Sequence, residues 1–291
     1  MTQLLTPTSP IESASTPRAD ARLDIKVRRA PSGGVHRRVH EEAPLRSFWP
    51  HLEAGQPPTV MLGNASGGVL GGDRLAWSVE VGADTPLLVT GQAAEKFYRA
   101  ASMETASLDV ALRVEDRGWL EWLPKGSIVF DGARMRRETR IEVRGSGRCL
   151  AGEVLVLGRV ARGEAWRRGF VRDAWSVSLD GRLAWFDALR LDDAVDDLED
   201  LARTPAALGG ATTIATCVLV AADASRWVEP AREALEDAPD VRCGVSALPG
   251  VLVARILGAI PLAVRGAWER CVRALRAAGG WPSTLPRVAT V

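Results

Sequence analysis

Two pairs of glycines precede an aspartate in the segment NASGGVLGGDRLAWSVEVG, residues 64–82. A glycine-rich segment can cradle phosphates where a helix N-terminus follows it, but the residues after Asp73 alternate between apolar and polar side chains, which predicts a strand. Neither GxxxxGK followed by Ser or Thr nor GxGxxG occurs in the segment. We therefore expect a tight turn that holds Asp73 at the start of the strand. The turn glycines are Gly67, Gly68, Gly71 and Gly72.

A second acid stands where its neighbours favour an apolar residue. The segment CLAGEVLVLG, residues 149–158, is apolar apart from Glu153 and predicts a strand buried on both faces. An ionised carboxylate is costly there unless it is paired, hydrogen-bonded or bound to a cation. Arg159 and Arg162, just downstream, are the candidate ion-pair partners. The sequence leaves two interpretations open, a paired structural acid and a functional carboxylate.

Polar groups also gather in TGQAAEKFYRA, residues 90–100, and in EWLPKGSIVFDGAR, residues 121–134. A serine hydrolase is not indicated, because the GxSxG nucleophile elbow does not occur and the three histidines lie near the N-terminus. No HExxH motif or His/Cys cluster predicts a tight metal cage. The four cysteines are far apart and in apolar contexts, so we expect four buried thiols in a cytoplasmic protein: Cys149, Cys217, Cys243 and Cys271.

The composition excludes two large function classes. The 291-residue chain has a formal net charge of +1, which predicts neither a nucleic-acid partner nor an anionic membrane surface. No apolar run is long enough to span a membrane, and no leader sequence is recognisable. Basic residues are dense in residues 134–144, but acids interrupt them and no aromatics interleave. We interpret that segment as a solvated strand face with cross-strand ion pairs.

Strand patterns dominate up to about residue 190. In residues 106–115, apolar and polar side chains alternate with the period of a half-buried strand, and Asp116-Arg117-Gly118 predicts a turn into a return strand at WLEWLP, residues 119–124. Helical patterns come late in the chain. They are residues 192–208 (weak and acidic at the start), residues 225–239 with Ser225 as the cap, and residues 261–280 with Gly279 as the stop, with a hairpin around Leu248-Pro249-Gly250 between the last two.

These patterns predict a mainly β fold: a large multi-stranded core, antiparallel or mixed, with about two helices in the C-terminal third. Residues 1–20 are rich in Pro, Ser and Thr and are expected to form a disordered tail before a single domain, residues 21–291. The predicted helix at residues 261–280 has an apolar face, which is either part of the core or a surface that binds a partner. That face comprises Val264, Trp268, Cys271, Val272 and Leu275.

Five segments taken together resemble the urease accessory proteins of the UreD family, called UreH in some bacteria. They are SGGVLGGDRL, TGQAAEKFYRA, LEWLPKGSIVFDGAR, GEVLVLGRVARGEAW and the closing LPRV, and they occur in the family's order from about Arg22 to Arg287. The resemblance implies an all-β core with two helices. The polar residues that match the family motifs are Gln92, Lys96, Tyr98, Arg99, Arg159 and Glu164.

The resemblance also implies a function. The chain would be a cytoplasmic scaffold, not an enzyme, that forms a hetero-oligomer with UreF-like and UreG-like proteins on the urease apoprotein. It would bind no cofactor tightly but pass Ni²⁺ transiently through an internal water-filled channel. Scattered carboxylates and water suit a cation that must be released. The candidate path residues are Asp73, Glu121, Asp131 and Glu153, with Glu164 a weaker candidate.

Two alternatives stay open at this point. Ten tryptophans and several acids are compatible with a β-barrel glycan-active enzyme that uses a carboxylate pair in an aromatic-lined cleft. A purely structural β-module would differ from the scaffold only in having no role for its acids in metal transfer.

Overall fold

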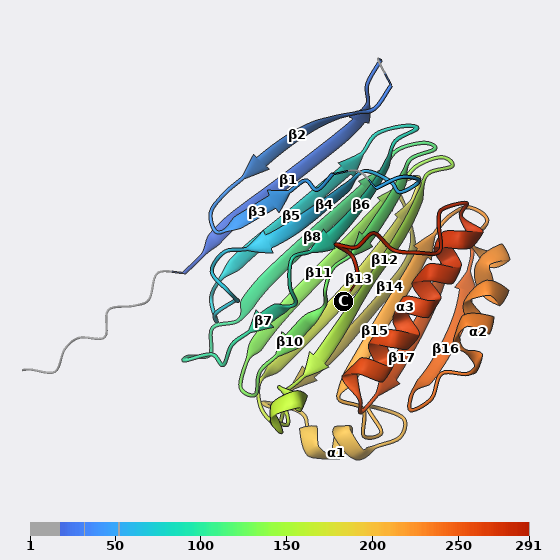
Figure 1. The fold of residues 1–291 in the computed structure, drawn as a ribbon. Helices are drawn as coiled ribbons and strands as arrows, with labels where there is room; N and C mark the ends of the chain where they lie inside the picture. Colours follow the sequence, from blue (N-terminus) through green and yellow to red (C-terminus); the bar gives the residue numbers. More distant parts are fainter. Residues whose placement is uncertain (1–17, 32, 52, 291) are drawn as a thin grey trace, which may run out of the picture.

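The computed structural model describes residues 18–31, 33–51 and 53–290 of the chain. About 47% of the residues lie in strands and about 15% in helices, and the sheets are mixed. The predicted fold class is confirmed (Figure 1). Of the expected disordered tail, residues 1–17 lie outside the described residues, and the first strand already begins at Asp20.

Two large sheets make up the body of the molecule. The seven-stranded sheet has the order β14 (Arg182–Asp192), β13 (Phe170–Leu179), β11 (Arg134–Val143), β8 (Ala106–Val114), β5 (Arg74–Val81), β1 (Asp20–Arg29) and β2 (Val35–Glu41). The ten-stranded sheet has the main order β16 (Arg242–Leu248), β17 (Val251–Gly258), β15 (Thr213–Val220), β12 (Arg148–Leu157), β9 (Trp119–Leu123), β6 (Pro86–Gly91), β4 (Thr59–Asn64) and β3 (Leu45–Phe48). Two short strands complete it: β10 (Ser127–Val129) pairs with β12 and with β7 (Glu95–Phe97).

Between β4 and β13 the chain winds back and forth between the two sheets. The strands β5, β8, β11 and β13 are neighbours and parallel in one sheet, while β4, β6, β9 and β12 are neighbours and parallel in the other. The turn at residues 116–118 therefore does not make the expected hairpin, because it carries the chain from β8 in one sheet to β9 in the other. Antiparallel pairs occur at the two ends of this winding, and the predicted hairpin of β16 and β17 is one of them.

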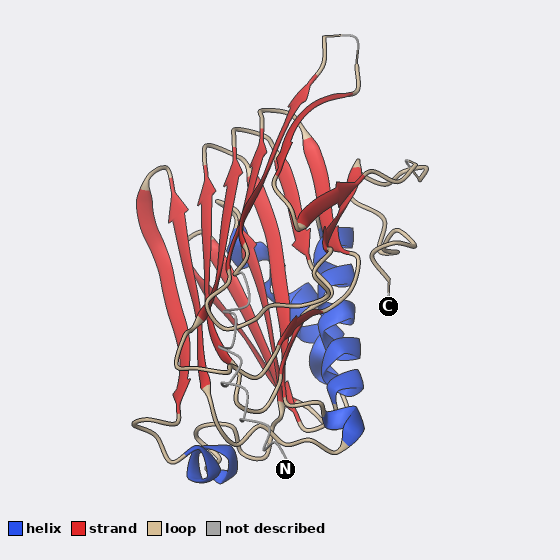
Figure 2. Cartoon of the chain, turned by 90° about the vertical axis from the view of Figure 1, so that its left-hand side faces the viewer, coloured by secondary structure: helices blue, strands red, loops and turns tan. Residues whose placement is uncertain are grey.

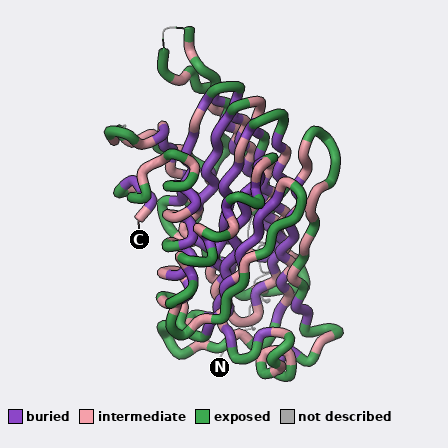
Figure 3. Tube along the Cα trace, turned by 90° about the vertical axis from the view of Figure 1, so that its right-hand side faces the viewer, coloured by how far each residue is buried: buried purple, intermediate pink, exposed green. Residues whose placement is uncertain are grey.

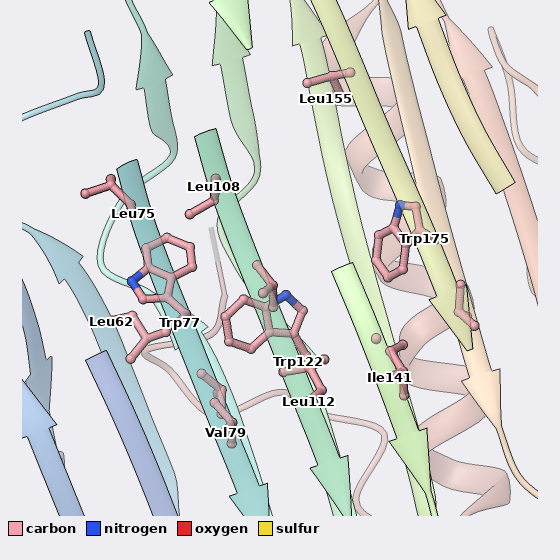
Figure 4. Packing of buried hydrophobic residues seen from close by; sticks show 14 of the residues in the cluster. Leu62, Leu75, Trp77, Val79, Leu108, Leu112, Trp122, Ile141, Leu155 and Trp175 are labelled. Atoms are coloured by element: carbon pink, nitrogen blue, oxygen red, sulfur yellow. The ribbon is translucent and has the colours of Figure 1, made fainter. Parts of the chain in front are cut away.

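A hydrophobic core fills the space between the sheets. In β8 the side chains of Leu108, Val110 and Leu112 are buried, as the alternation of the sequence predicts. Trp77 of β5 and Trp122 of β9 face each other with ring centroids 5.9 Å apart (Figure 4). Buried residues follow the strands, and exposed residues gather in the connections (Figure 3). The opposed apolar faces therefore hold the two sheets together.

A second apolar cluster lies between the outer face of the ten-stranded sheet and two helices, α2 (Val228–Glu236) and α3 (Pro261–Ala278) (Figure 2). This corrects the partner-surface interpretation of the α3 face, because each of its residues is at most 2% exposed. The buried residues are Val264, Trp268, Cys271, Val272 and Leu275. The helix ends at Gly279 as predicted.

The structure also tests three smaller predictions, on the cap of α2, the helix near residue 200 and the burial of the cysteines. Ser225 is not the cap of α2, because a short 3-10 helix (Ala224–Trp227) precedes it. The weak helical signal around residue 200 is α1 (Leu198–Arg203), which is capped by Asp197. Cys243 is exposed rather than buried, because it lies on β16, an edge strand; the other three cysteines are buried.

Within the described residues, no helix has the length and apolar character needed to cross a membrane.

The glycine pairs form a turn, as the sequence predicts. Gly67, Gly68 and Gly72 have positive φ. At Gly71, a Cβ would lie 2.6 Å from the carbonyl oxygen of Glu104. Two different physical reasons, dihedral angle and close approach, thus exclude larger side chains from this turn.

Gly68→Val is expected to reduce the yield of soluble protein more than Gly72→Val. A Cβ at Gly68 would lie 2.3 Å from the Tyr98 ring and 2.8 Å from the carbonyl oxygen of Lys96, so the backbone itself would have to move. At Gly72, φ is 90°, but the nearest atom is 3.0 Å away on the flexible side chain of Arg18. Soluble yield and thermal midpoint measure the difference. A Gly68→Val protein with wild-type yield and midpoint would refute the close-approach argument.

Candidate functional site

A small cavity with both polar and apolar lining residues lies within the space between the sheets. Its volume is about 110 Å³, and its walls come from β5, β8 and β11 on one side and from β4, β6, β9 and β12 on the other. Residues of segments 91–96 and 124–127 complete the lining, and Trp77 and Trp122 form an apolar part of it (Figure 4). The polar lining residues are Asn64, Thr90, Gln92, Glu95, Lys96, Ser127, Arg137, Thr139 and Glu153.

Arg137 of β11 is the centre of a buried charge cluster beside this cavity. Its Nε and Nη2 atoms donate to the two carboxylate oxygens of Asp173, at 2.9 and 2.6 Å. Its Nη1 atom lies 3.0 Å from Glu153 Oε1 and donates to Ser127 Oγ at 3.0 Å. The side chains of Arg137, Glu153 and Asp173 are 2%, 8% and 10% exposed. One guanidinium thus faces two carboxylates, and the cluster is net negative when all three are ionised.

The structure decides one of the questions that the sequence left open. Glu153 is paired, but the predicted partners, Arg159 and Arg162, are wrong. Arg159 instead binds Glu164 at 2.8 Å. The true partner is Arg137. The sequence shows that it falls on the apolar face of β11, beside Met135 and Thr139, but does not identify the acid that it meets.

Two acids on the cavity have perturbed protonation. Burial raises the pKa of Glu153 above its ordinary range, and the positive charge of Arg137 opposes that shift. Burial also raises the pKa of Glu95 to about 7, against a hydrogen bond that Asn64 donates to its Oε1 at 3.2 Å. The negative charge of Glu153 adds to the shift of Glu95. The cavity therefore gains negative charge as the pH rises through 7.

Ionisation of Glu95 is expected to make the folded state less stable as the pH rises. The pKa of Glu95 is about 7 in the folded state and near its ordinary value of 4.5 in the unfolded state, so its contribution is most favourable below 4.5 and is lost between 4.5 and 7. Glu95→Gln removes this pH-dependent contribution to the free energy of unfolding. Urea unfolding at pH 5, 6 and 7.5 should show the variant gaining stability relative to the wild type as the pH rises. Parallel pH profiles for the two proteins would contradict the assignment.

The other predicted path residues do not line this cavity. Both oxygens of Asp73 accept backbone hydrogen bonds, from Ala19 at 2.8 Å and from Leu70 at 2.7 Å, and so hold the glycine turn. Asp131 accepts from the backbone nitrogens of residues 167 and 168, at 2.8 and 3.0 Å, and orders that loop. Glu121 points to the other face of its sheet, where it pairs with Arg276. The structure thus places the four candidate acids at four separate positions.

The family-motif residues fall into two groups. Gln92 and Lys96 line the cavity. Tyr98 instead donates from its hydroxyl to the carbonyl oxygen of Gly67 at 3.1 Å, and Arg99 pairs with Asp131 at 3.1 Å. The sequence patterns did not single out Glu95, which lies between Gln92 and Lys96 in the same motif and also lines the cavity.

Within the described residues, no group of three or more His, Cys, Asp or Glu side chains could hold a metal ion. The cavity instead offers oxygen atoms that are few and mixed: the carboxylates of Glu95 and Glu153 and the hydroxyls of Ser127 and Thr90. The Thr90 hydroxyl is buried and has no hydrogen-bond partner among the described residues, so a water molecule or a hydrated cation can satisfy it. Such a set suits weak, transient cation binding.

The chain is mainly β and winds between two sheets around a small cavity, with its longer helices on one outer face. The profile of the family described as "UreD urease accessory protein" matches residues 19–290. The chain belongs to this family.

Relatives from several bacteria have similar sequences over most of their length. The chain is 37% identical over 254 residues to the urease accessory protein UreD of Magnetococcus marinus, covering 86% of each chain. It is 39% identical over 245 residues to UreD of Paracoccus denitrificans, covering 84% of this chain and 83% of the relative. It is also 39% identical over 252 residues to UreD of a Methylobacterium strain, covering 85% and 86%. The family resemblance of the sequence motifs is thereby confirmed.

Proposed function

We propose that this chain is a cytoplasmic, non-enzymatic scaffold of urease maturation, which assembles with UreF-like and UreG-like proteins on the urease apoprotein and passes Ni²⁺ to it. Membership of the UreD family supports the link to urease. The proposed passage uses the cavity between the sheets and retains Glu153 from the predicted path, together with Glu95. Ni²⁺ is the cargo here, not a resident cofactor.

The observation that carries the proposal is the pair of acids that line this cavity, Glu95 and Glu153. Both acids come from the ten-stranded sheet, and the one cation in contact with Glu153, Arg137, is shared with Asp173. A buried carboxylate is stabilised by a cation. Because Arg137 competes for Glu153, a cation there is held weakly and can leave.

Glu153→Gln is expected to leave the complex with its partners intact and to lower the nickel content of urease activated in cells. The amide retains the shape of the side chain and the contact with Ser127, so the fold should persist, while the charge that attracts the cation is lost. Nickel per urease active site, by elemental analysis, and pull-down of the complex are measured together.

Glu142→Gln is the matched control, because Glu142 lies on the solvent-facing side of β11 and pairs with Arg113 and Arg144. It should change neither measurement. Normal nickel in urease activated with Glu153→Gln would contradict the cation route. A lost complex would show that Glu153 is structural.

The glycan-active alternative finds less support. Trp77 and Trp122 do lie on the cavity wall, and two carboxylates face it. However, its volume of about 110 Å³ is well below the ~300 Å³ at which ligand pockets begin. Sugar binding by the isolated chain, measured by calorimetry, would revive this alternative.

A further inference from the structure

An open groove lies on the surface next to the cavity. Its volume is about 580 Å³, and it runs between the start of α3 and the strands β10 and β12. Ile128, Val154, Val156 and Leu262 give it an apolar lining. The groove shares residues 92–94 and Ser127 with the lining of the cavity. A molecule seated in the groove would therefore contact the wall of the cavity from outside.

The apolar surface at this groove is exposed in the isolated chain. Leu262, at the start of α3, is 77% exposed, and the neighbouring Ile260 is 50% exposed. Ile260 and Leu262 stand on either side of Pro261, which also lines the groove. Exposed apolar side chains beside a groove are typical of a surface that a partner covers.

The groove carries two cations, of which Arg265 pairs with Glu269 and Lys125 has no carboxylate partner among the described residues. Lys125 and Arg265 both line it. Lys125 contacts the carbonyl oxygen of Thr290, and no carboxylate of the described residues lies within 4.0 Å of its ammonium group. Arg265 donates to the carbonyl oxygen of Lys125 at 2.8 Å, and its nearest acid, Glu269, is 3.7 Å away.

The start of α3 adds to this positive potential. The first turn contains no acidic residue, although the N-terminus of a helix carries a partial positive charge. Burial, and to a smaller extent the nearby Arg265, lowers the pKa of Lys125 from its ordinary value, while the negative charge of Glu269 opposes that shift. A carboxylate placed in the groove would be stabilised by Lys125 and by Arg265, which it would share with Glu269.

We propose that this groove binds a short apolar segment of a partner protein that carries an Asp or Glu side chain, with the apolar part against Leu262 and the carboxylate between Lys125 and Arg265. The inference rests on the proposed function, because the partner is expected among the UreF-like protein, the UreG-like protein and the urease apoprotein. The bound segment would cover the outer side of segment 92–94, next to the cavity.

The test measures the affinity of the purified chain for each of those three proteins by biolayer interferometry. Leu262→Asp and Lys125→Glu should each weaken the binding of one of the three at least tenfold. Leu262→Asp should not weaken the helix, since an acid in the first turn interacts favourably with the helix dipole. Leu183→Asp and Arg182→Glu are the matched controls, because both residues are exposed on β14, at an edge of the other sheet, and should leave the affinities unchanged.

A photo-crosslinking residue at position 262 then identifies the occupant. A crosslinked partner peptide with apolar residues and at least one Asp or Glu supports the proposal. A crosslink to a second copy of this chain or to its own C-terminal residues overturns it, as do unchanged affinities in both groove variants. If the wild-type chain binds none of the three proteins, the proposed function fails as well, so the two failures can be told apart.

Discussion

Arg276→Ala is expected to lower the free energy of unfolding by about 3–5 kcal/mol, because it leaves the Glu121 carboxylate buried without its cation. Neither side chain of this pair is exposed. Arg276 also donates to Gln56 Oε1 at 2.6 Å and to the carbonyl oxygen of Pro282 at 3.2 Å, and Trp119 Nε1 donates to Glu121 at 2.8 Å. The pair thus joins α3, β9 and two loops, and burial lowers the pKa of Arg276 to about 10, which still leaves it charged at neutral pH.

Urea unfolding of the wild type and Arg276→Ala at pH 7 measures this loss. Replacing both charges together, as in Arg276→Met with Glu121→Leu, should recover much of the stability, because no isolated charge then remains. A loss below about 1 kcal/mol in Arg276→Ala, the range of exposed pairs, would show that water reaches this site.

Arg137→Leu is expected to destabilise the protein by a similar amount, about 3–5 kcal/mol near neutral pH. The substitution leaves Glu153 and Asp173 buried within the sandwich without the guanidinium that contacts both. Both carboxyl groups should then take up protons at a higher pH than in the unfolded chain. Because the folded state then binds more protons than the unfolded state, the stability of the variant should fall as the pH rises from about 5 to 8.

Two further variants separate charge from geometry at this cluster. Arg137→Lys retains the positive charge but loses the paired donors that bind Asp173, so an intermediate stability is expected. Combining Arg137→Leu with Glu153→Gln and Asp173→Asn should flatten the pH profile. Unfolding curves of all four proteins at pH 5 and 8 provide the measurement. If Arg137→Leu were as stable as the wild type at pH 8, the cluster would not be a buried ion-pair network.

Much of the fold follows from the alternation of side chains, but the pairing of the strands does not. Residues 106–114 form a strand as predicted, with Leu108 inside and Asp109 outside. The following turn could not reveal whether the next strand returns to the same sheet, because a short connection serves either case. The segment WLEWL illustrates the same limit: all five residues of β9 are buried because both faces of the ten-stranded sheet are covered.

The candidate site, too, could be predicted from the sequence only in part. Glu153 was recognisable because an acid in an apolar strand is costly, and this local argument needs no knowledge of the fold. Its partner lies 16 residues earlier in another sheet, and only the three-dimensional arrangement brings Arg137 to it. Asp73 and Asp131 have no such signal, because hydrogen bonds to backbone nitrogens of distant segments cannot be distinguished in sequence from a metal path.

The winding of the chain between the sheets has a consequence for its synthesis. Leu75 lies opposite Leu108, and Ser107 lies opposite Arg136, so a strand and its parallel neighbour are 33 or 29 residues apart in the chain. At translation rates of about 5–20 residues per second, each new strand edge waits about 1.5–7 s for its neighbour. During that interval, unpaired backbone donors and acceptors remain open to any other extended chain. Slow translation should therefore favour aggregation of the nascent protein, and early capture of the growing edge by a chaperone should protect it.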